Sequence, residues 1–232
     1  SKKVIVALDS NNFNKTIKLV KSLKKDVYAF KIGYQFFFSF GLEGYKKIYS
    51  ICPRIFLDLK LHDIPNTVSN AIISLSKINP DYLTLHIAGG KIMLKQSLAT
   101  IKKLKIKTRL LGVTLLTSLD HNDSKQIFSQ KNTNLLVQKF ANIANISKLH
   151  GLICSGQDLE NLQKFKKLTK ITPGVKLFKR KDDQKRVTFA HDALENGADY
   201  VVIGRELINS ENPTKLLKRY YEENKNKNLW TK

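Results

Sequence analysis

Residues 56–68 read FLDLKLHDIPNTV, a stretch that combines a strand, a turn and the start of a helix. Side chains on a strand alternate between two faces, so the three leucines share an apolar face that we expect to be buried. Asp58 and Lys60 share the opposite face, with Cα atoms roughly 6–7 Å apart. Asp63 and Pro65 then indicate a turn into a helix. The stretch therefore predicts a buried strand with charged groups at its carboxyl end.

The same order of strand and helix recurs along the whole chain. Apolar runs that predict strands occupy residues 4–8, 27–32, 55–60, 82–87, 109–116, 151–154, 170–174 and 200–204. Segments with helical periodicity lie between them, residues 158–168 included, and the units repeat at roughly 25 residues. Eight strands that are mostly continuous apolar runs favour parallel pairing. We therefore expect residues 1–232 to form a single α/β domain, a (β/α)8 TIM barrel.

The main alternative is a doubly wound open sheet, which would need fewer strands. The first strand is also not followed by the GxGxxG pattern of dinucleotide-binding sheets. In a barrel, the polar residues at the carboxyl ends of the strands all face one mouth. The residues in such positions are Asp9, Lys31, Asp58, Lys60, His86, Thr117, Ser118, Ser155, Pro173, Gly204 and Arg205.

The composition indicates a globular protein with a sizeable core. The chain has 232 residues, 42% of them hydrophobic, and no run of about 18 apolar residues that would predict a transmembrane helix. The first residues, SKKVIVALDS, lack the apolar segment and cleavage site of a signal peptide. Cys52 and Cys154 are the only cysteines and lie far apart in the sequence. We expect a cytoplasmic protein without a membrane partner.

The net charge of +22 comes from 41 Lys and Arg against 19 Asp and Glu. Such an excess can indicate nucleic-acid binding. Here the lysines are dispersed over every predicted helix, which favours a solvated lysine surface and no nucleic-acid partner. A positive field around an anionic substrate is compatible with either interpretation.

Acidic and basic residues alternate across the first three predicted strands, in the order Asp9, Lys31, Asp58, Lys60 and Asp63. A lone Asp after a strand is usually part of a turn or a helix cap. Lys31, however, interrupts an apolar run, and a buried charge needs a partner. In a parallel barrel the second strand lies between the first and the third, so Lys31 can reach both Asp9 and Asp58. The cluster is either a structural ion-pair network or a site with tunable pKa values.

The segment VVIGREL, residues 201–207, has the features of a phosphate site. Gly204 allows a close approach of the backbone, the following residues begin a helix, and Arg205 supplies a forked donor. Pro173, in the TPG segment of the seventh strand, adds a second close approach. The loops after strands 7 and 8 are the usual phosphate position in this barrel. The alternative is a glycine that only turns the chain, followed by a surface arginine.

The histidines do not indicate a metal site. His86 could equally be a core histidine, and the other four show no paired spacing. The sequence contains no HxH, HExxH or CxxC pattern. It also contains no serine flanked by glycines in the manner of an acyl-transfer nucleophile. We therefore expect no built-in zinc site.

FLDLKLHDIPNTV resembles the signature of the orotidine 5′-phosphate decarboxylases, with its DxKxxD core and DIPNTV continuation. The segments VIVALD, FKIG, TLHIAGG, GVTLLTSL, ITPG, DDQ and DYVVIGR occur in the order and spacing of the bacterial branch of that family. The resemblance covers residues 3–213. It implies an enzyme that converts orotidine 5′-phosphate to UMP, the final step of de novo pyrimidine synthesis, without a metal or cofactor.

The resemblance also implies roles for individual residues. Asp9 and Lys31 would bind the ribose hydroxyls, and Lys31, Asp58 and Lys60 would form a charged network at the pyrimidine, with Lys60 donating a proton to C6. A second subunit would complete this network, so the enzyme would be a homodimer with shared active sites. The subunit's contribution would be Asp63, Ile64 and Thr67. The base would contact Thr117 or Ser118, and the 5′-phosphate would contact Gln184, Gly204 and Arg205.

Two departures from the family pattern concern the loop over the phosphate. Lys176 stands where relatives commonly have Arg, and residues 177–183 lack the glycines common there. They affect the expected closure of this loop rather than the chemistry.

Two other functions compete with this one. A 3-keto-gulonate-6-phosphate decarboxylase or hexulose-phosphate synthase of the same superfamily shares DxKxxD but uses Mg²⁺ with an acid at the end of strand 2. Lys31 stands at that position here and would repel a metal. A nucleic-acid-binding barrel is suggested by the charge alone, and Asp9, Asp58 and Asp63 would repel its phosphates.

Overall fold

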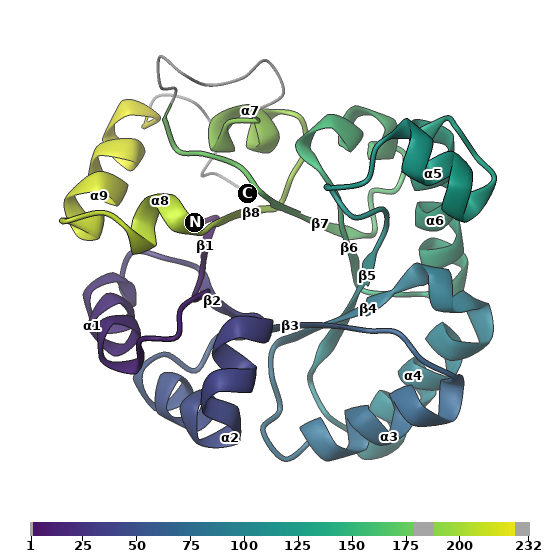
Figure 1. Cartoon of the computed structure of the whole chain (residues 1–232), viewed down its shortest axis with the longest axis horizontal. Helices are drawn as coiled ribbons and strands as arrows, with labels where there is room; N and C mark the ends of the chain where they lie inside the picture. The colour runs from purple at the N-terminus through teal and green to yellow at the C-terminus, as the bar shows by residue number, and fades with distance from the viewer. Residues whose placement is uncertain (1, 179–187, 226–232) are drawn as a thin grey trace. The chain divides into compact units, whose positions relative to one another are not determined.

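The computed structural model describes residues 2–178 and 188–225. In these residues the strands follow one another around a closed barrel in chain order, β1 to β8. Figure 1 traces the alternation of strands and helices along the chain. The strands are β1 (Val4–Ala7), β2 (Ala29–Ile32), β3 (Ile55–Leu61), β4 (Tyr82–His86), β5 (Arg109–Val113), β6 (Gly151–Ile153), β7 (Thr169–Pro173) and β8 (Tyr200–Ile203). The prediction of a (β/α)8 TIM barrel is therefore confirmed, and the open sheet is wrong.

The described chain divides into two compact units. Unit 1 contains the described residues up to Asp58 and from Thr172 onward, and unit 2 is Leu59–Ile171. The boundaries fall within β3 and β7. That residues 1–232 form one domain stays a prediction.

In unit 1, β1 pairs in parallel with both β2 and β8, and β2 pairs with the start of β3. Val4, Ile5 and Val6 have no exposed surface, as expected of a parallel strand buried on both faces. The helices of this unit are α1 (Phe13–Leu23), α2 (Tyr34–Ile51), α7 (Ala190–Glu195), α8 (Arg205–Ile208) and α9 (Pro213–Glu223). The side chain of Asn12 caps α1 by accepting a hydrogen bond from the Lys15 N–H.

In unit 2, β4, β5, β6 and β7 pair in sequence, all in parallel. The helices are α3 (Pro65–Leu75), α4 (Gly90–Leu104), α5 (His121–Phe128) and α6 (Thr133–Ser147). Three short 3₁₀ turns complete the unit: η1 (Ile87–Gly89), η2 (Gly156–Asp158) and η3 (Glu160–Leu162). None of the helices in the described residues of either unit is long and apolar enough to cross a bilayer.

The predicted helix over residues 158–168 is wrong. The structure has the 3₁₀ turns η2 and η3 there, followed by further turns. The buried side chains Leu159, Leu162, Phe165 and Leu168 recur every third residue. That period matches the three residues per turn of a 3₁₀ helix rather than the 3.6 of an α-helix. The ammonium of Lys170 donates to the carbonyls of Phe165 and Leu168 and so stabilises these turns.

We expect Leu57→Ala to destabilise the protein strongly. Leu57 lies on β3 with no exposed surface, so truncation leaves a cavity in the core of unit 1 and lowers the free energy of unfolding by about 2–5 kcal/mol. Leu42→Ala, in the same unit, is the matched control because Leu42 is 48% exposed, and its cost is below about 1 kcal/mol. Urea unfolding of the two variants and the parent measures both values. Equal losses would contradict the assignment of Leu57 to the core.

Candidate active site

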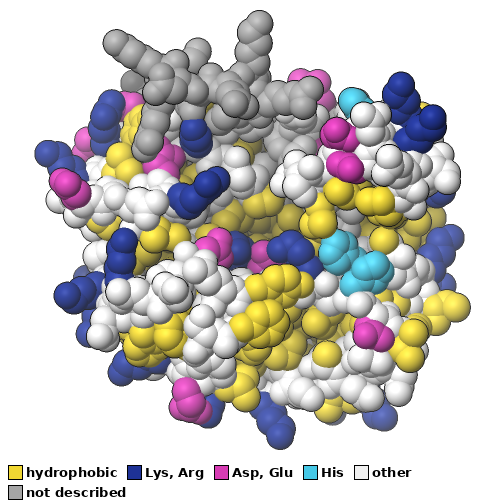
Figure 2. Space-filling model, in the orientation of Figure 1, with side chains coloured by type: hydrophobic (Ala, Val, Ile, Leu, Met, Phe, Trp, Pro, Cys, Tyr) yellow, Lys and Arg dark blue, Asp and Glu magenta, His cyan; other side chains and the backbone are white. Residues whose placement is uncertain are grey.

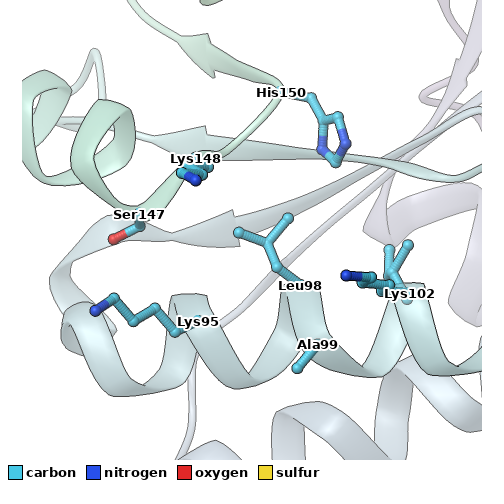
Figure 3. A pocket seen from close by; sticks show the side chains of 8 residues that line it. Lys95, Leu98, Ala99, Lys102, Ser147, Lys148 and His150 are labelled. Carbon is cyan, nitrogen blue, oxygen red and sulfur yellow. The ribbon is translucent and has the colours of Figure 1, made fainter.

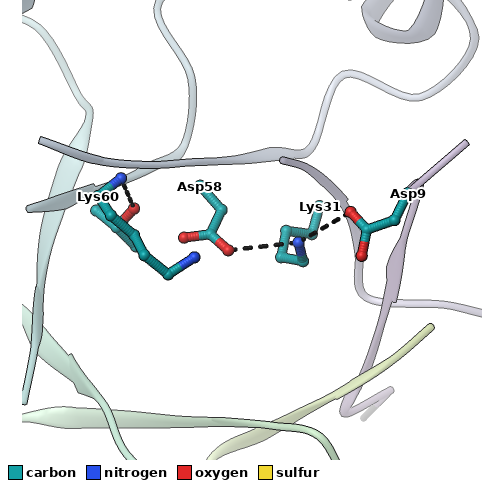
Figure 4. A network of polar contacts seen from close by, with 5 residues as sticks. Asp9, Lys31, Asp58 and Lys60 are labelled. Carbon is teal, nitrogen blue, oxygen red and sulfur yellow. Dashed lines mark hydrogen bonds and ion pairs between the residues drawn. The ribbon is translucent and has the colours of Figure 1, made fainter. Parts of the chain in front are cut away.

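The carboxyl ends of the first three strands bring together three of the predicted site residues, all in unit 1. The ammonium of Lys31 on β2 lies 3.3 Å from Asp9 Oδ1 and 3.3 Å from Asp58 Oδ2 (Figure 4). The register explains the arrangement, because Ala7 and Phe56 are the strand partners of Lys31 and each precedes one of the acids by two residues. Both acids therefore point to the side of the sheet on which Lys31 lies.

This ion-paired group is largely withdrawn from solvent. The side chains of Lys31 and Asp58 are each 10% exposed, whereas that of Asp9 is 46% exposed. Burial of a charge is costly unless the charge is paired, and here one ammonium is shared by two carboxylates. The group carries a net charge of about −1 when all three residues are ionised. It can therefore accept hydrogen bonds from a ligand at a position that is still reached from solvent through Asp9.

Gly33 leaves no free space beside this group. A Cβ atom added to Gly33 would lie 3.0 Å from Asp9 Oδ1 and 3.0 Å from Lys31 Nζ. The backbone thus approaches the ion pairs at the point where β2 leads into α2. This role of Gly33 was not predicted, although FKIG places the glycine two residues after Lys31.

Lys60 lies on β3 two residues beyond Asp58, in unit 2. Its φ is 42°, in the left-handed region that a bulky residue rarely adopts. Its main-chain N–H donates to Thr84 Oγ1 at 2.8 Å, the bond drawn beside Lys60 in Figure 4. Thr84 is fully buried on β4. The regular strand assumed from the alternation therefore does not hold at Lys60. Neither this conformation nor the role of Thr84 has a signal in the sequence.

Three predicted residues surround the turn from β3 into α3. Asp63 is exposed, and its Oδ1 accepts the N–H of Ile64 at 2.7 Å. Ile64 is 67% exposed and Thr67 is also exposed. Pro65 is the first residue of α3, so the turn that the sequence predicts leads into a helix here. In the single chain these side chains therefore line an exposed turn.

Thr117 and Ser118 are exposed in the loop after β5, also in unit 2. The loop ends at Asp120, whose side chain accepts the N–H groups of Asn122 and Asp123 and so caps α5. The hydroxyls of Thr117 and Ser118 therefore lie on a loop whose carboxyl end is held by the cap of α5.

The predicted phosphate residues lie at the ends of β7 and β8 in unit 1. Pro173 ends β7, and Gly204 follows β8 with Arg205 exposed as the first residue of the single-turn helix α8. A Cβ at Gly204 would meet only Ala7 Cβ at 3.6 Å, which is an ordinary contact. In the described part of the chain, no other atom beyond the glycine's chain neighbours lies within 4 Å of that position. Gln184 lies outside the described residues.

Glu206, which was not predicted as a site residue, links the segment after β8 to the segment after β7. Its Oε2 accepts the N–H of Leu177 at 2.7 Å, which joins the start of α8 to the segment after β7. Lys176 is held on the same segment by backbone hydrogen bonds with Thr188 and Ala190. These hydrogen bonds link Glu206, the residue after Arg205, to residues 176–177 and hold the latter against residues 188–190.

The histidines do not form a metal centre. The rings of His62 and His86 lie 5.1 Å apart, so His86 is half-buried beside another histidine rather than enclosed in the core. His150 Nδ1 accepts the N–H of Leu110, and burial together with the charge of Arg109 lowers its pKa. Within the described ranges, no three His, Cys, Asp or Glu side chains are grouped to hold a metal ion.

A pocket of about 340 Å³ lies elsewhere in unit 2, between α4 and the end of α6 (Figure 3). Three lysines, Lys95, Lys102 and Lys148, line it together with His150. None of the predicted site residues lines this pocket, so it is separate from the candidate active site. On the face drawn in Figure 2, Lys and Arg side chains are dispersed rather than gathered in one patch.

Comparisons with known proteins identify the family of the chain. The model of the "Orotidine 5'-phosphate decarboxylase / HUMPS family" matches residues 2–220. A relative from Wolbachia sp. subsp. Brugia malayi, named orotidine 5′-phosphate decarboxylase, is 37% identical over 90% of this chain and 93% of its own length. A relative of the same name from Buchnera aphidicola subsp. Baizongia pistaciae is 38% identical over 92% of each chain.

Solved structures give the same result. Orotidine 5′-phosphate decarboxylase from Lactobacillus acidophilus superposes with a TM-score of 0.80 at 29% identity, covering 96% of this chain and 99% of that one. Orotidine 5′-monophosphate decarboxylase from Methanocaldococcus jannaschii, complexed with the inhibitor BMP, has a TM-score of 0.77 at 26% identity, with coverage of 95% and 97%. From its sequence and its fold, this chain belongs to the orotidine 5′-phosphate decarboxylase / HUMPS family.

Proposed function

We propose that the chain decarboxylates orotidine 5′-phosphate to UMP. The observation that carries this proposal is the ammonium of Lys31, held 3.3 Å from the carboxylates of Asp9 and Asp58. The family includes both the nucleotide enzyme and the sugar-phosphate enzymes, so membership alone does not choose between them. The relatives that are 37–38% identical are all named for the nucleotide enzyme.

The position of Lys31 argues against the Mg²⁺-dependent alternative. A divalent cation would take carboxylate oxygens as ligands, and the ammonium already lies between the two carboxylates at this point. A metal placed there would meet a positive charge instead of the acid that the sugar-phosphate enzymes need. The same two acids disfavour a nucleic-acid phosphate.

In the proposed reaction, the bond between C6 and the carboxylate of the substrate breaks and CO₂ leaves. The electron pair stays on C6, and the Lys60 ammonium stabilises it and then transfers a proton to it. Asp58 precedes Lys60 by two residues on β3, so the chain itself keeps their backbones close. Asp58 then orients Lys60 and faces the departing carboxylate. Protein groups alone carry out these steps, so we propose no cofactor.

The remaining contacts follow the polar groups of the substrate. Asp9 and Lys31 bind the ribose hydroxyls, and Thr117 or Ser118 contacts the base. Arg205 pairs with the phosphate, helped by Gly204, Pro173 and Gln184. Phosphate contacts lie far from C6, and their binding energy orders the site for the reaction.

We also propose a homodimer in which Asp63, Ile64 and Thr67 of one subunit complete the site of the other. The exposure of Ile64 at 67% supports this, because a second subunit would bury this large apolar side chain. Asp63 is exposed beside it and is available to a second chain. A cytoplasmic location stays a prediction from the cysteine content.

The function is tested by adding orotidine 5′-phosphate to the purified chain and following the fall in orotate absorbance. We expect turnover that is unchanged by EDTA, because the proposed chemistry uses only protein groups. Activity that is lost with EDTA and restored by Mg²⁺ would favour a metal-dependent enzyme. Absence of turnover in a folded sample would reject the proposal.

Arg205→Ala should weaken binding of UMP by about 10- to 100-fold, since a charge-assisted hydrogen bond to the phosphate is lost. Binding of uridine, which has no phosphate, should be unchanged. Isothermal titration with the two ligands gives both affinities. Arg219→Ala on α9 is the control, because Arg219 is exposed and pairs with Glu223. An equal loss for UMP and uridine would contradict the phosphate role of Arg205.

Lys60→Ala and Asp63→Asn should each be inactive alone and regain activity when mixed. In a mixed dimer, one of the two sites contains the native Lys60 and the native Asp63 from different chains. Random exchange of equal amounts therefore restores about one quarter of the parent activity. Native mass spectrometry confirms the exchange before the assay. No recovery in a sample shown to contain mixed dimers would mean that each site lies within one chain.

A further inference from the structure

We propose that Thr84 is a positioning residue for the decarboxylation. Its hydroxyl holds the main chain of Lys60 in a left-handed conformation, and this conformation sets the direction of the Lys60 side chain. The inference rests on the proposed function, because it concerns the orientation of the proposed proton donor. Thr84 itself does not need to touch the substrate.

The backbone of Lys60 is unusual for its place in the fold. Five residues other than glycine have positive φ in the described part of the chain: Lys60, Asn79, Lys105, Ser129 and Lys148. Lys105, Ser129 and Lys148 follow the last residues of helices, where a left-handed residue commonly ends the helix. Asn79 lies in the turn after α3, and Asn tolerates this region well. Of these five, Lys60 alone lies inside a strand.

Such a conformation has to be maintained by its surroundings. A non-glycine residue in a sparsely populated backbone region costs on the order of 1–3 kcal/mol, and such residues cluster at functional sites. The φ of 42° lies far from the value of about −120° that a residue has in a regular parallel strand. The acceptor at this N–H is a side chain, Thr84 Oγ1 at 2.8 Å.

Thr84 is well suited to fix the position of that acceptor. It has no exposed surface, and it lies in the middle of β4, paired with Leu111 on β5. Threonine is branched at Cβ, which restricts its χ1 rotation in a strand. The hydroxyl therefore stays in one place relative to the sheet. A fixed acceptor at the N–H of Lys60 restrains both the backbone and the Cα–Cβ direction of that residue.

A positioning role differs from a purely structural one in what its loss changes. If Thr84 only satisfied a buried N–H, its removal would lower the stability of the fold and leave the turnover of the folded enzyme alone. If Thr84 orients the Lys60 side chain, removal of its hydroxyl slows the chemical step, while the contacts that bind ribose and phosphate persist. The loss should then appear in kcat and not in KM or in UMP affinity.

The test compares three variants with the parent enzyme. Thr84→Val keeps the shape of the side chain and removes the acceptor, and Thr84→Ser keeps the hydroxyl. Thr108→Val is the matched control, because Thr108 is also buried in unit 2 and bonds Asn79 through its hydroxyl. For each protein we measure kcat and KM for orotidine 5′-phosphate, the Kd of UMP and the melting temperature.

We expect Thr84→Val to lower kcat by about 10- to 100-fold, as small misplacements of a reacting group do, with KM and the UMP Kd within about threefold. Thr84→Ser should keep kcat within about threefold of the parent, and so should Thr108→Val. A Thr84→Val enzyme with parental kcat would refute the inference. So would a folded Thr84→Ser enzyme that loses turnover despite its hydroxyl, a result that is decisive even if the valine variant does not fold. Lack of turnover in the parent enzyme would instead reject the proposed function.

Discussion

The ammonium of Lys31 lies between two carboxylates, 3.3 Å from each, and the arrangement of the site depends on this contact. Lys31 and Asp58, each 10% exposed, need one another, because a buried charge that loses its partner costs several kcal/mol. The contact also requires that β2 lie between β1 and β3 in the observed register, and a side chain at residue 33 would crowd it, with a Cβ 3.0 Å from both Asp9 Oδ1 and Lys31 Nζ. Fold and charge pattern therefore constrain each other at this end of unit 1.

The same contact separates functions that share one scaffold. A barrel hosts many reactions, and the function has to be argued from the side chains at its mouth. The acids alone would suit a metal ion as well as a network of hydrogen bonds. The ammonium of Lys31 between them occupies the place that a metal ion would need, and this favours the network of hydrogen bonds.

The sequence was sufficient to predict the barrel and the ion-paired group, for reasons that can be stated. Buried parallel strands leave continuous apolar runs, and Lys31 interrupts one of them, so its partners could be sought on the adjacent strands. The sequence was not sufficient for the conformation of Lys60, which a hydroxyl on β4 holds from another strand. The helix predicted over residues 158–168 failed because a three-residue period was taken for a helical one. Glu206 was missed because its partner is a backbone N–H, which leaves no sequence pattern.

The pairing of β1 with β8 has a consequence for biosynthesis. Residues 4–6 pair with residues 201–203, almost 200 residues further along the chain. Because the ribosome synthesises the amino end first, the edge of β1 that pairs with β8 stays unpaired until the last strand has emerged. Residues 59–171 are continuous and can collapse while translation proceeds. The nascent chain therefore has a long interval in which an apolar edge is open to intermolecular pairing, which makes prompt chaperone protection of the amino end valuable.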